Sequence, residues 1–189
     1  MTERLDVYLC DRLAGALERT DGCVSFRYLP EYLRSDSPAV VSSTLPLCES
    51  AYEERDVKSF VDRVVFNFVI GNGDAHGKNF SVLYRDGTPR LAPQYDLICT
   101  TVYPQIGRRM AMKFDGKFEF RWITPGKIVR TFERAGIGGK LVRDSIERQV
   151  VAVRGELPGI LDEFNAKFPS PVYHDICRGI HSRIRQLSA

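Results

Sequence analysis

Hydrophobic and polar residues alternate along the first thirty residues of the chain. Leu5, Val7 and Leu9 alternate with other residues, and a second apolar run at 13–17 is followed by the turn pair Asp21-Gly22 and a third run at 23–28. A period of two predicts β-strands, and a D-G pair between two such runs predicts a tight turn. We therefore expect a small antiparallel meander here, followed by a short proline-started helical turn at 30–33.

The pattern changes after residue 50. Residues 35–50 are rich in serine and proline and are expected to form loop or extended edge, whereas residues 53–70 contain neither glycine nor proline. Apolar residues recur there at helical spacing: Val57, Phe60, Val61, Val64, Val65, Phe68 and Val69. This pattern predicts a helix with one broad buried face, which Gly71-Asn72-Gly73 then ends.

The rest of the chain divides into three parts. Residues 81–84 and 89–93 flank the turn residues 85–87 and predict a short hairpin, which its prolines limit to an edge. The segment from Asp96 to Trp122 has no clear period, and the last third predicts four helices at 125–135, 141–154, 157–168 and 172–187. The fold class is therefore α+β, with a β subdomain over residues 1–50 and a mostly helical domain over residues 51–189.

Composition and charge exclude several classes of protein. The 189 residues are 43% hydrophobic and 27% charged, as in an ordinary globular protein. The apolar run at 64–70 is far shorter than the ~20 residues of a membrane helix, and the first residues do not resemble a signal peptide, so we expect a cytoplasmic protein with no membrane association. Five widely spaced cysteines suggest neither a disulfide framework nor a zinc site.

The net charge of +3 is too small to indicate nucleic acid, but basic residues are concentrated between Arg121 and Arg154. Eight lysines and arginines of this stretch face only Glu133, Asp144 and Glu147. On helices such a run predicts a solvated face, and a nucleic-acid surface is the alternative.

One segment carries candidate chemistry. In IGNGDAHGKNFSVLYRDG, residues 70–87, Asp74 and Asn79 have the spacing D-x-x-x-x-N at the end of the predicted buried helix. Protein kinases use this spacing because an aspartate must accept the proton of the attacking hydroxyl while an asparagine oxygen reaches a magnesium ion on the nucleotide phosphates. The alternative is a purely structural role, in which the segment ends the helix and forms a turn, since aspartate and asparagine are common loop residues.

A second carboxylate strengthens the kinase interpretation. Asp96 follows the predicted hairpin, where a kinase places its other magnesium ligand. Magnesium takes hard oxygen ligands and usually only one or two protein carboxylates, so Asn79 and Asp96 meet its needs. Lys78 could neutralise charge on the transferred phosphoryl group, and His76 either bonds to the backbone or holds the aspartate in place.

These residues also carry a family resemblance. FNFVIGNGDAHGKNFSVLY at 66–84, followed by RLAPQYDLICT at 90–100, resembles the carboxy-terminal kinase lobe of the HipA-type toxin kinases, serine/threonine kinases of bacterial type II toxin-antitoxin systems. Residues 5–33, with SSTLPL at 42–47, resemble the amino-terminal subdomain of the same family.

The resemblance implies a kinase-like C-lobe and a set of roles. Asp74 would be the catalytic base, with His76 beside it in the catalytic loop, Asn79 and Asp96 the magnesium ligands, and Lys78 a neighbour of the phosphates. ATP and Mg²⁺ would be the cofactors. The partners would be a small DNA-binding antitoxin of HipB type, through which DNA is contacted only indirectly, and a protein substrate, an aminoacyl-tRNA synthetase in the best-known branch.

The sequence departs from the family pattern at one point. Between about Glu49 and Asp56, where the two resembling parts meet, it shows no glycine-rich phosphate loop, no strand lysine for the nucleotide and no activation-loop serine. Because phosphoryl transfer depends on positioning and charge stabilisation, their loss would slow the reaction. Two functions therefore remain open: a shortened, impaired kinase, and a catalytically silent module that binds an antitoxin or another partner.

Overall fold

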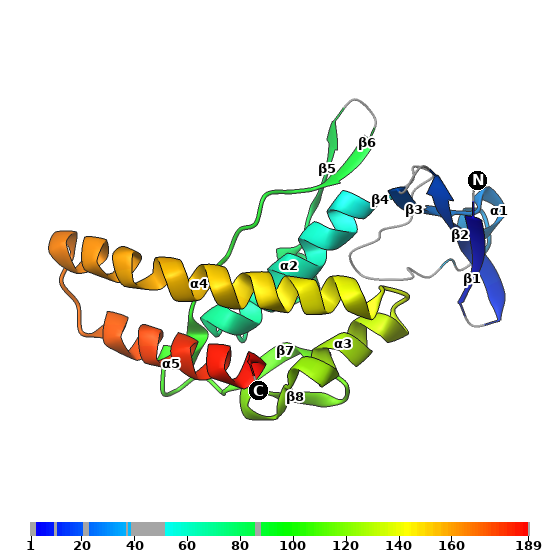
Figure 1. Ribbon diagram of the computed structural model, residues 1–189. Helices are drawn as coiled ribbons and strands as arrows, with labels where there is room; N and C mark the ends of the chain where they lie inside the picture. The colour runs from blue at the N-terminus through cyan, green and yellow to red at the C-terminus, as the bar shows by residue number, and fades with distance from the viewer. Residues whose placement is uncertain are drawn as a thin grey trace. The chain divides into compact units, whose positions relative to one another are not determined.

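The computed structural model describes residues 3–9, 11–20, 23–36, 38, 52–85 and 88–188 (Figure 1). Contacts along the backbone divide the chain into two compact units, one of residues 1–60 and 80–93 and the other of residues 61–79 and 94–189. Most of the expected serine- and proline-rich loop, the domain boundary at residue 50 and residues 49–51 of the junction between the two resembling parts lie outside the described residues.

The first unit contains the meander that the alternating pattern predicts. Strands β1 (Glu3–Leu9), β2 (Arg12–Thr20) and β3 (Cys23–Tyr28) pair antiparallel in chain order, and the short β4 (Tyr52–Glu53) adds to β3. Helix α1 (Pro30–Leu33) folds back on the sheet, because the Leu29 N–H donates to the Ala14 carbonyl at 3.0 Å. The core between the meander and α1 is aromatic. The centroid of the Tyr28 ring lies 4.8 Å from that of Phe26 and 6.1 Å from that of Tyr32.

The predicted hairpin belongs to the same unit. Strands β5 (Val82–Arg85) and β6 (Thr88–Leu91) pair antiparallel. Asp56, in the first turns of the long helix α2 (Glu54–Ile70), binds this hairpin through Arg90 Nε at 2.9 Å and the Leu91 N–H at 3.2 Å. The Phe60 and Phe80 rings, with centroids 5.0 Å apart, add an apolar contact.

The second unit is built on the rest of α2, whose Val61, Val64, Val65, Phe68 and Val69 are all at most 2% exposed. Helices α3 (Pro125–Arg134), α4 (Gly139–Lys167) and α5 (Val172–Leu187) complete it, and α4 and α5 run antiparallel (Figure 1). Asp62 Oδ1 links α2 to α4, since it accepts hydrogen bonds of 2.6 Å from both Ser145 Oγ and Arg148 Nη2. No helix among the described residues has both the length and the apolar character needed to cross a membrane.

Two expectations for the last part of the chain are wrong. Residues 141–154 and 157–168 form the single helix α4, which contains Pro158. Pro158 is exposed, so the Arg154 carbonyl that loses its helical partner lies where water can replace it. The segment from Asp96 to Trp122 is also not wholly irregular, because strands β7 (Arg109–Phe114) and β8 (Lys117–Glu119) form a second hairpin within it.

Candidate active site

The candidate site begins where α2 ends. Gly71 has a φ of +79°, and a Cβ there would lie 2.5 Å from Thr101 Oγ1, so the position favours glycine for both conformation and space. The Gly71 N–H donates to the Phe68 carbonyl and the Asn72 N–H to the Asn67 carbonyl. The helix therefore stops at the glycine, as predicted, and the chain turns into the loop 71–79.

Asn72 organises this loop, and the sequence pattern did not identify it as more than a turn residue. Its side chain is 1% exposed, and Nδ2 donates to Asn67 Oδ1 at 2.8 Å and to the Asp96 carbonyl at 2.9 Å. Its Oδ1 accepts the backbone N–H of Asp74 at 3.1 Å. One buried carboxamide thus connects the backbones of the two candidate acidic residues, which are 22 residues apart in the sequence.

Asn79 and Asp96, the two predicted magnesium ligands, lie in contact. Asn79 Nδ2 donates a hydrogen bond to Asp96 Oδ2. The loop holds Asn79 from the other side, since its Oδ1 accepts the His76 N–H at 3.0 Å and its own N–H donates to the His76 carbonyl at 2.9 Å. Asp96 is exposed and has a φ of +56°, a conformation that aspartate tolerates better than most residues.

The other predicted site residues, Asp74, His76 and Lys78, lie in the same loop, but their side chains make no hydrogen bonds to each other. Asp74 and Lys78 are exposed, and neither side chain makes a hydrogen bond or ion pair within the described part of the chain. The Lys78 carbonyl accepts the Tyr95 hydroxyl at 2.6 Å, which is a second link between the loop and the segment before Asp96. His76 Nδ1 is buried with no partner among the described residues, so the structure provides no bond from His76 to Asp74.

The β7–β8 hairpin, which the sequence pattern did not predict, packs against the loop 71–79. The Ala111 N–H of β7 donates to the Gly73 carbonyl at 2.7 Å, and Thr100 Oγ1 accepts the Gly73 N–H at 2.8 Å. A Cβ on Gly73 would lie 2.6 Å from the Arg109 carbonyl. The backbone of the loop therefore packs directly against β7, at a distance that a larger residue does not permit.

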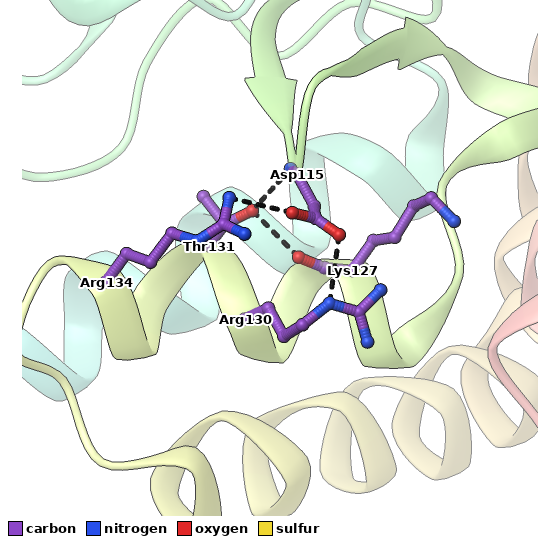
Figure 2. Close-up of polar contacts among 5 residues, drawn as sticks. All are labelled: Asp115, Lys127, Arg130, Thr131 and Arg134. Atoms are coloured by element: carbon purple, nitrogen blue, oxygen red, sulfur yellow. Dashed lines mark hydrogen bonds and ion pairs between the residues drawn. The ribbon is translucent and has the colours of Figure 1, made fainter.

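Figure 2 shows how this hairpin is fixed to α3. Asp115, in the β7–β8 turn, accepts from Arg130 Nε at 2.9 Å and pairs with Arg134 Nη1 at 2.7 Å, while its N–H donates to Thr131 Oγ1 at 2.8 Å. The hydrogen bond from Arg130 and the charge of Arg134 together lower the pKa of the Asp115 carboxyl. One carboxylate in the turn of the hairpin on which the candidate loop rests thus pairs with two arginines of one helix.

The basic stretch at 121–154 has more carboxylate partners than its own sequence supplies. Arg121 pairs with Glu119, Arg130 and Arg134 with Asp115, Lys140 with Asp144, and Arg148 with Asp62. Asp62, Asp115 and Glu119 all come from other elements of the chain. This pairing favours a solvated helix surface over the alternative of a nucleic-acid surface.

The donor atoms of the site suit one kind of metal. Among the described residues, no group of three or more histidine, cysteine, aspartate and glutamate side chains could hold a metal ion. Asn79 and Asp96 are a smaller set, one carboxamide and one carboxylate in contact, and magnesium bound together with phosphate oxygens and water needs no more. The residues therefore fit a magnesium ion held jointly with a phosphate chain, provided that the Asn79 carboxamide turns its oxygen towards Asp96.

Comparison with known proteins places the chain in a family. The profile of the family described as HipA-like C-terminal domain matches residues 1–157. Y4mE of Sinorhizobium fredii, whose name marks it as a candidate kinase, is 32% identical over 185 residues, which are 96% of this chain and 43% of Y4mE. The serine/threonine-protein kinase toxin HipA of Shewanella oneidensis is 29% identical over 84 residues, 44% of this chain and 19% of that protein.

A solved structure supports the fold. The complex of Shewanella oneidensis HipA, HipB and operator DNA contains a chain that matches 70% of this one with a TM-score of 0.60 and 20% identity, over 32% of its own length. At this identity the likeness bears on the fold alone, and it confirms the α+β architecture. The chain spans less than half the length of these relatives. Because the profile covers most of its residues, the chain belongs to the family of HipA-like C-terminal domains.

Proposed function

We propose that the protein is a HipA-like serine/threonine kinase in which Asp74, Asn79 and Asp96 carry the chemistry. The observation that supports this best is the contact of Asn79 with Asp96, together with the buried Asn72 that bonds to the backbones of Asp74 and Asp96. These bonds fix the backbones of two exposed acidic residues relative to each other, as a site that uses both carboxylates requires. The reaction class is transfer of the ATP γ-phosphoryl group to a protein hydroxyl.

Each side chain has a distinct role in this proposal. The exposed Asp74 carboxylate accepts the proton of the substrate hydroxyl, which needs a side chain that a large substrate can reach. Asp96 and Asn79 hold Mg²⁺ with the ATP phosphates, and bound Mg-ATP supplies the phosphoryl group and part of the charge neutralisation. The exposed Lys78 adds a positive charge beside the phosphates. His76 shapes the loop through its backbone carbonyl, which accepts the Asn79 N–H whichever way the Asn79 carboxamide is turned.

Titration calorimetry with Mg-ADP and Mg-ATP tests the binding half of the proposal. Asp96→Asn keeps the size of the side chain and tolerates the positive φ, but it removes the charge. We expect at least a tenfold weaker affinity for this variant, and an unchanged affinity for Asp162→Asn, which alters an exposed carboxylate on α4. No binding by the wild-type chain at millimolar nucleotide, or equal binding by Asp96→Asn, would remove the kinase proposal.

The catalytic half needs a different variant. Asp74→Asn should bind Mg-ATP as the wild type does, because Asp74 is not a proposed ligand, but it should transfer phosphate about 10² to 10⁴ times more slowly if the carboxylate is a general base. Phosphorylated serine and threonine can be counted by mass spectrometry after incubation with candidate substrates, an aminoacyl-tRNA synthetase among them. Equal transfer rates for Asp74→Asn and wild type would exclude Asp74 as the base.

A second candidate function is a binding module without catalysis. It is favoured by the likeness to a chain solved in a complex with HipB and operator DNA. In this proposal the chain binds a small DNA-binding antitoxin, and DNA is contacted only through that partner. Co-purification with such an antitoxin, with complex formation unchanged by Asp74→Ala, would support this function. Loss of the complex in Asp74→Ala would contradict a binding surface separate from the site.

A further inference from the structure

A buried arginine lies behind the candidate site. Arg183 of α5 is 7% exposed, and no carboxylate pairs with it within the described part of the chain. Burial lowers its pKa, and the nearby Cys99 opposes this shift. A buried cation without an anion is costly, so its polar contacts have to compensate for the lost water. Arg183 also lies beyond residue 157, where the match to the family profile ends.

The first contact of Arg183 is with the end of α2. Its Nε donates to the Val69 carbonyl at 2.8 Å. Carbonyls in the last turn of a helix lack helical partners, and the Gly73 N–H, four residues further on, donates to Thr100 Oγ1 at 2.8 Å. Arg183 therefore supplies the missing donor, with its charge at the negative end of the helix dipole.

The second contact is with the segment that follows Asp96. Nη1 of Arg183 donates to Thr101 Oγ1 at 3.4 Å, and the Thr101 N–H donates to the Gly71 carbonyl at 3.2 Å. Thr101 thus connects the arginine to the first residue of the loop 71–79. The Arg183 side chain therefore bonds both to Val69, just before the loop 71–79, and to Thr101, in the segment that follows Asp96.

The surroundings of Arg183 leave its guanidinium little freedom. The guanidinium carbon lies 5.6 Å from the centroid of the Phe120 ring. A Cβ on Gly71 would lie 2.6 Å from Nη2, and one on Gly179 would lie 3.1 Å from it. Both glycines therefore make room for the guanidinium, which is fixed by packing as well as by hydrogen bonds.

We propose that Arg183 is a positioning residue of the candidate active site, which sets the separation of Asp74 and Asp96 by holding the loop 71–79 against the segment 96–101. Arg183 makes no hydrogen bond or ion pair with Asp74, Asn79 or Asp96, so its effect passes through Val69, Thr101 and Gly71. An effect of Arg183 on nucleotide binding rests on the proposed function. The effect of Arg183 on the loop 71–79 and the segment 96–101 does not depend on that function.

Amide hydrogen exchange of the nucleotide-free chain tests the structural part, because local opening is measured residue by residue. Arg183→Met keeps much of the apolar volume but removes both hydrogen bonds. Since a hydrogen bond from a charged group contributes about 1.5 to 3 kcal/mol, exchange in 71–79 and 96–101 should be roughly 10 to 100 times faster. Arg183→Lys, which keeps one charged donor, should restore part of the protection.

The control separates local positioning from a general loss of stability. Val142→Ala removes a fully buried side chain of α4 and lowers the stability of the same unit. Exchange in 71–79 and 96–101 should then rise no more than elsewhere in the unit. If Arg183→Met gave the same uniform rise as Val142→Ala, Arg183 would be only a core residue and the proposal would be wrong.

Two further measurements keep the test decisive. If Arg183→Met does not fold, Thr101→Val removes the hydroxyl that accepts from Arg183 Nη1 and contacts Cys99 Sγ, while the Thr101 N–H can still donate to the Gly71 carbonyl. Faster exchange confined to the two segments is then expected, and unchanged exchange would overturn the proposal. Titration of Arg183→Lys with Mg-ADP should show at least a tenfold loss of affinity if the site binds nucleotide. If the wild type binds none, the kinase proposal fails and the exchange data alone still decide the role of Arg183.

Discussion

Replacing Gly71 by alanine should destabilise the second unit far more than the same change at another glycine of the same backbone conformation. Gly71 and Gly116 have φ values of +79° and +80°, so a Cβ costs each about 1 to 2 kcal/mol in the left-handed region. The smaller freedom of the unfolded alanine chain offsets about 0.4 to 1 kcal/mol of this. For Gly116→Ala, which has no atom within 4 Å of the new Cβ, we expect a net loss of about 1 kcal/mol.

Gly71→Ala adds a collision to the same strain. Its Cβ would lie 2.5 Å from Thr101 Oγ1 and 2.6 Å from Arg183 Nη2, and the buried arginine cannot move without breaking its bond to the Val69 carbonyl. Breaking a hydrogen bond from a charged group costs about 1.5 to 3 kcal/mol. The total for Gly71→Ala is then about 3 kcal/mol, roughly 2 kcal/mol more than for Gly116→Ala.

Urea and thermal unfolding measure this difference. The protein has one tryptophan, Trp122, and it lies in the second unit, so its fluorescence reports on the unit that contains both glycines. At about 2 to 4 °C per kcal/mol, the midpoint should fall by about 3 °C for Gly116→Ala and by about 9 °C for Gly71→Ala. Equal shifts for the two variants would refute the reasoning, because the strain alone would then explain both. Gly136→Ala, also with a positive φ and open space, is a second control.

Two more changes test the parts of the structure that hold the site. Asn72→Ala removes the acceptor of the Asp74 N–H and two donated hydrogen bonds, so a loss of about 2 to 4 kcal/mol is expected in urea unfolding, and a loss below 1 kcal/mol would contradict its role as a buried link. Asp115→Asn should make stability less dependent on pH in acid. The folded pKa of Asp115 is lowered, so its contribution is present above the unfolded pKa of about 3.9 and is lost as the pH falls through the folded value. The thermal midpoints of Asp115→Asn and wild type should therefore differ at pH 7 and approach each other as the pH falls below the unfolded pKa towards the lower folded pKa, and a gap that stays constant throughout would contradict the pairing with Arg130 and Arg134.

The local sequence pattern was sufficient to predict an element whose structure depends on neighbouring residues alone. The apolar spacing at 57–69 predicted α2, because a helix repeats every 3.6 residues and only one face was apolar. The spacing of Asp74 and Asn79, with Asp96 after the hairpin, also selected the loop 71–79 and the aspartate that Asn79 contacts. The missed β7–β8 hairpin had a signal of the same kind in Met110, Met112 and Phe114, which alternate before the turn at Asp115-Gly116.

By itself the sequence determined most of the helices and strands, and which short motif is the candidate for the chemistry, because these depend on residues close together along the chain. Only the tertiary structure decided that Asn72 bonds to Asp96, that Thr100 and β7 support Gly73, and that Arg183 reaches Val69 from 114 residues away. It also decided that Asp62 pairs with Arg148, and Asp115 with Arg130 and Arg134, of the basic stretch. Such contacts join residues that no period or spacing relates, since a buried polar group takes whichever partner the packing of distant elements brings within hydrogen-bond distance.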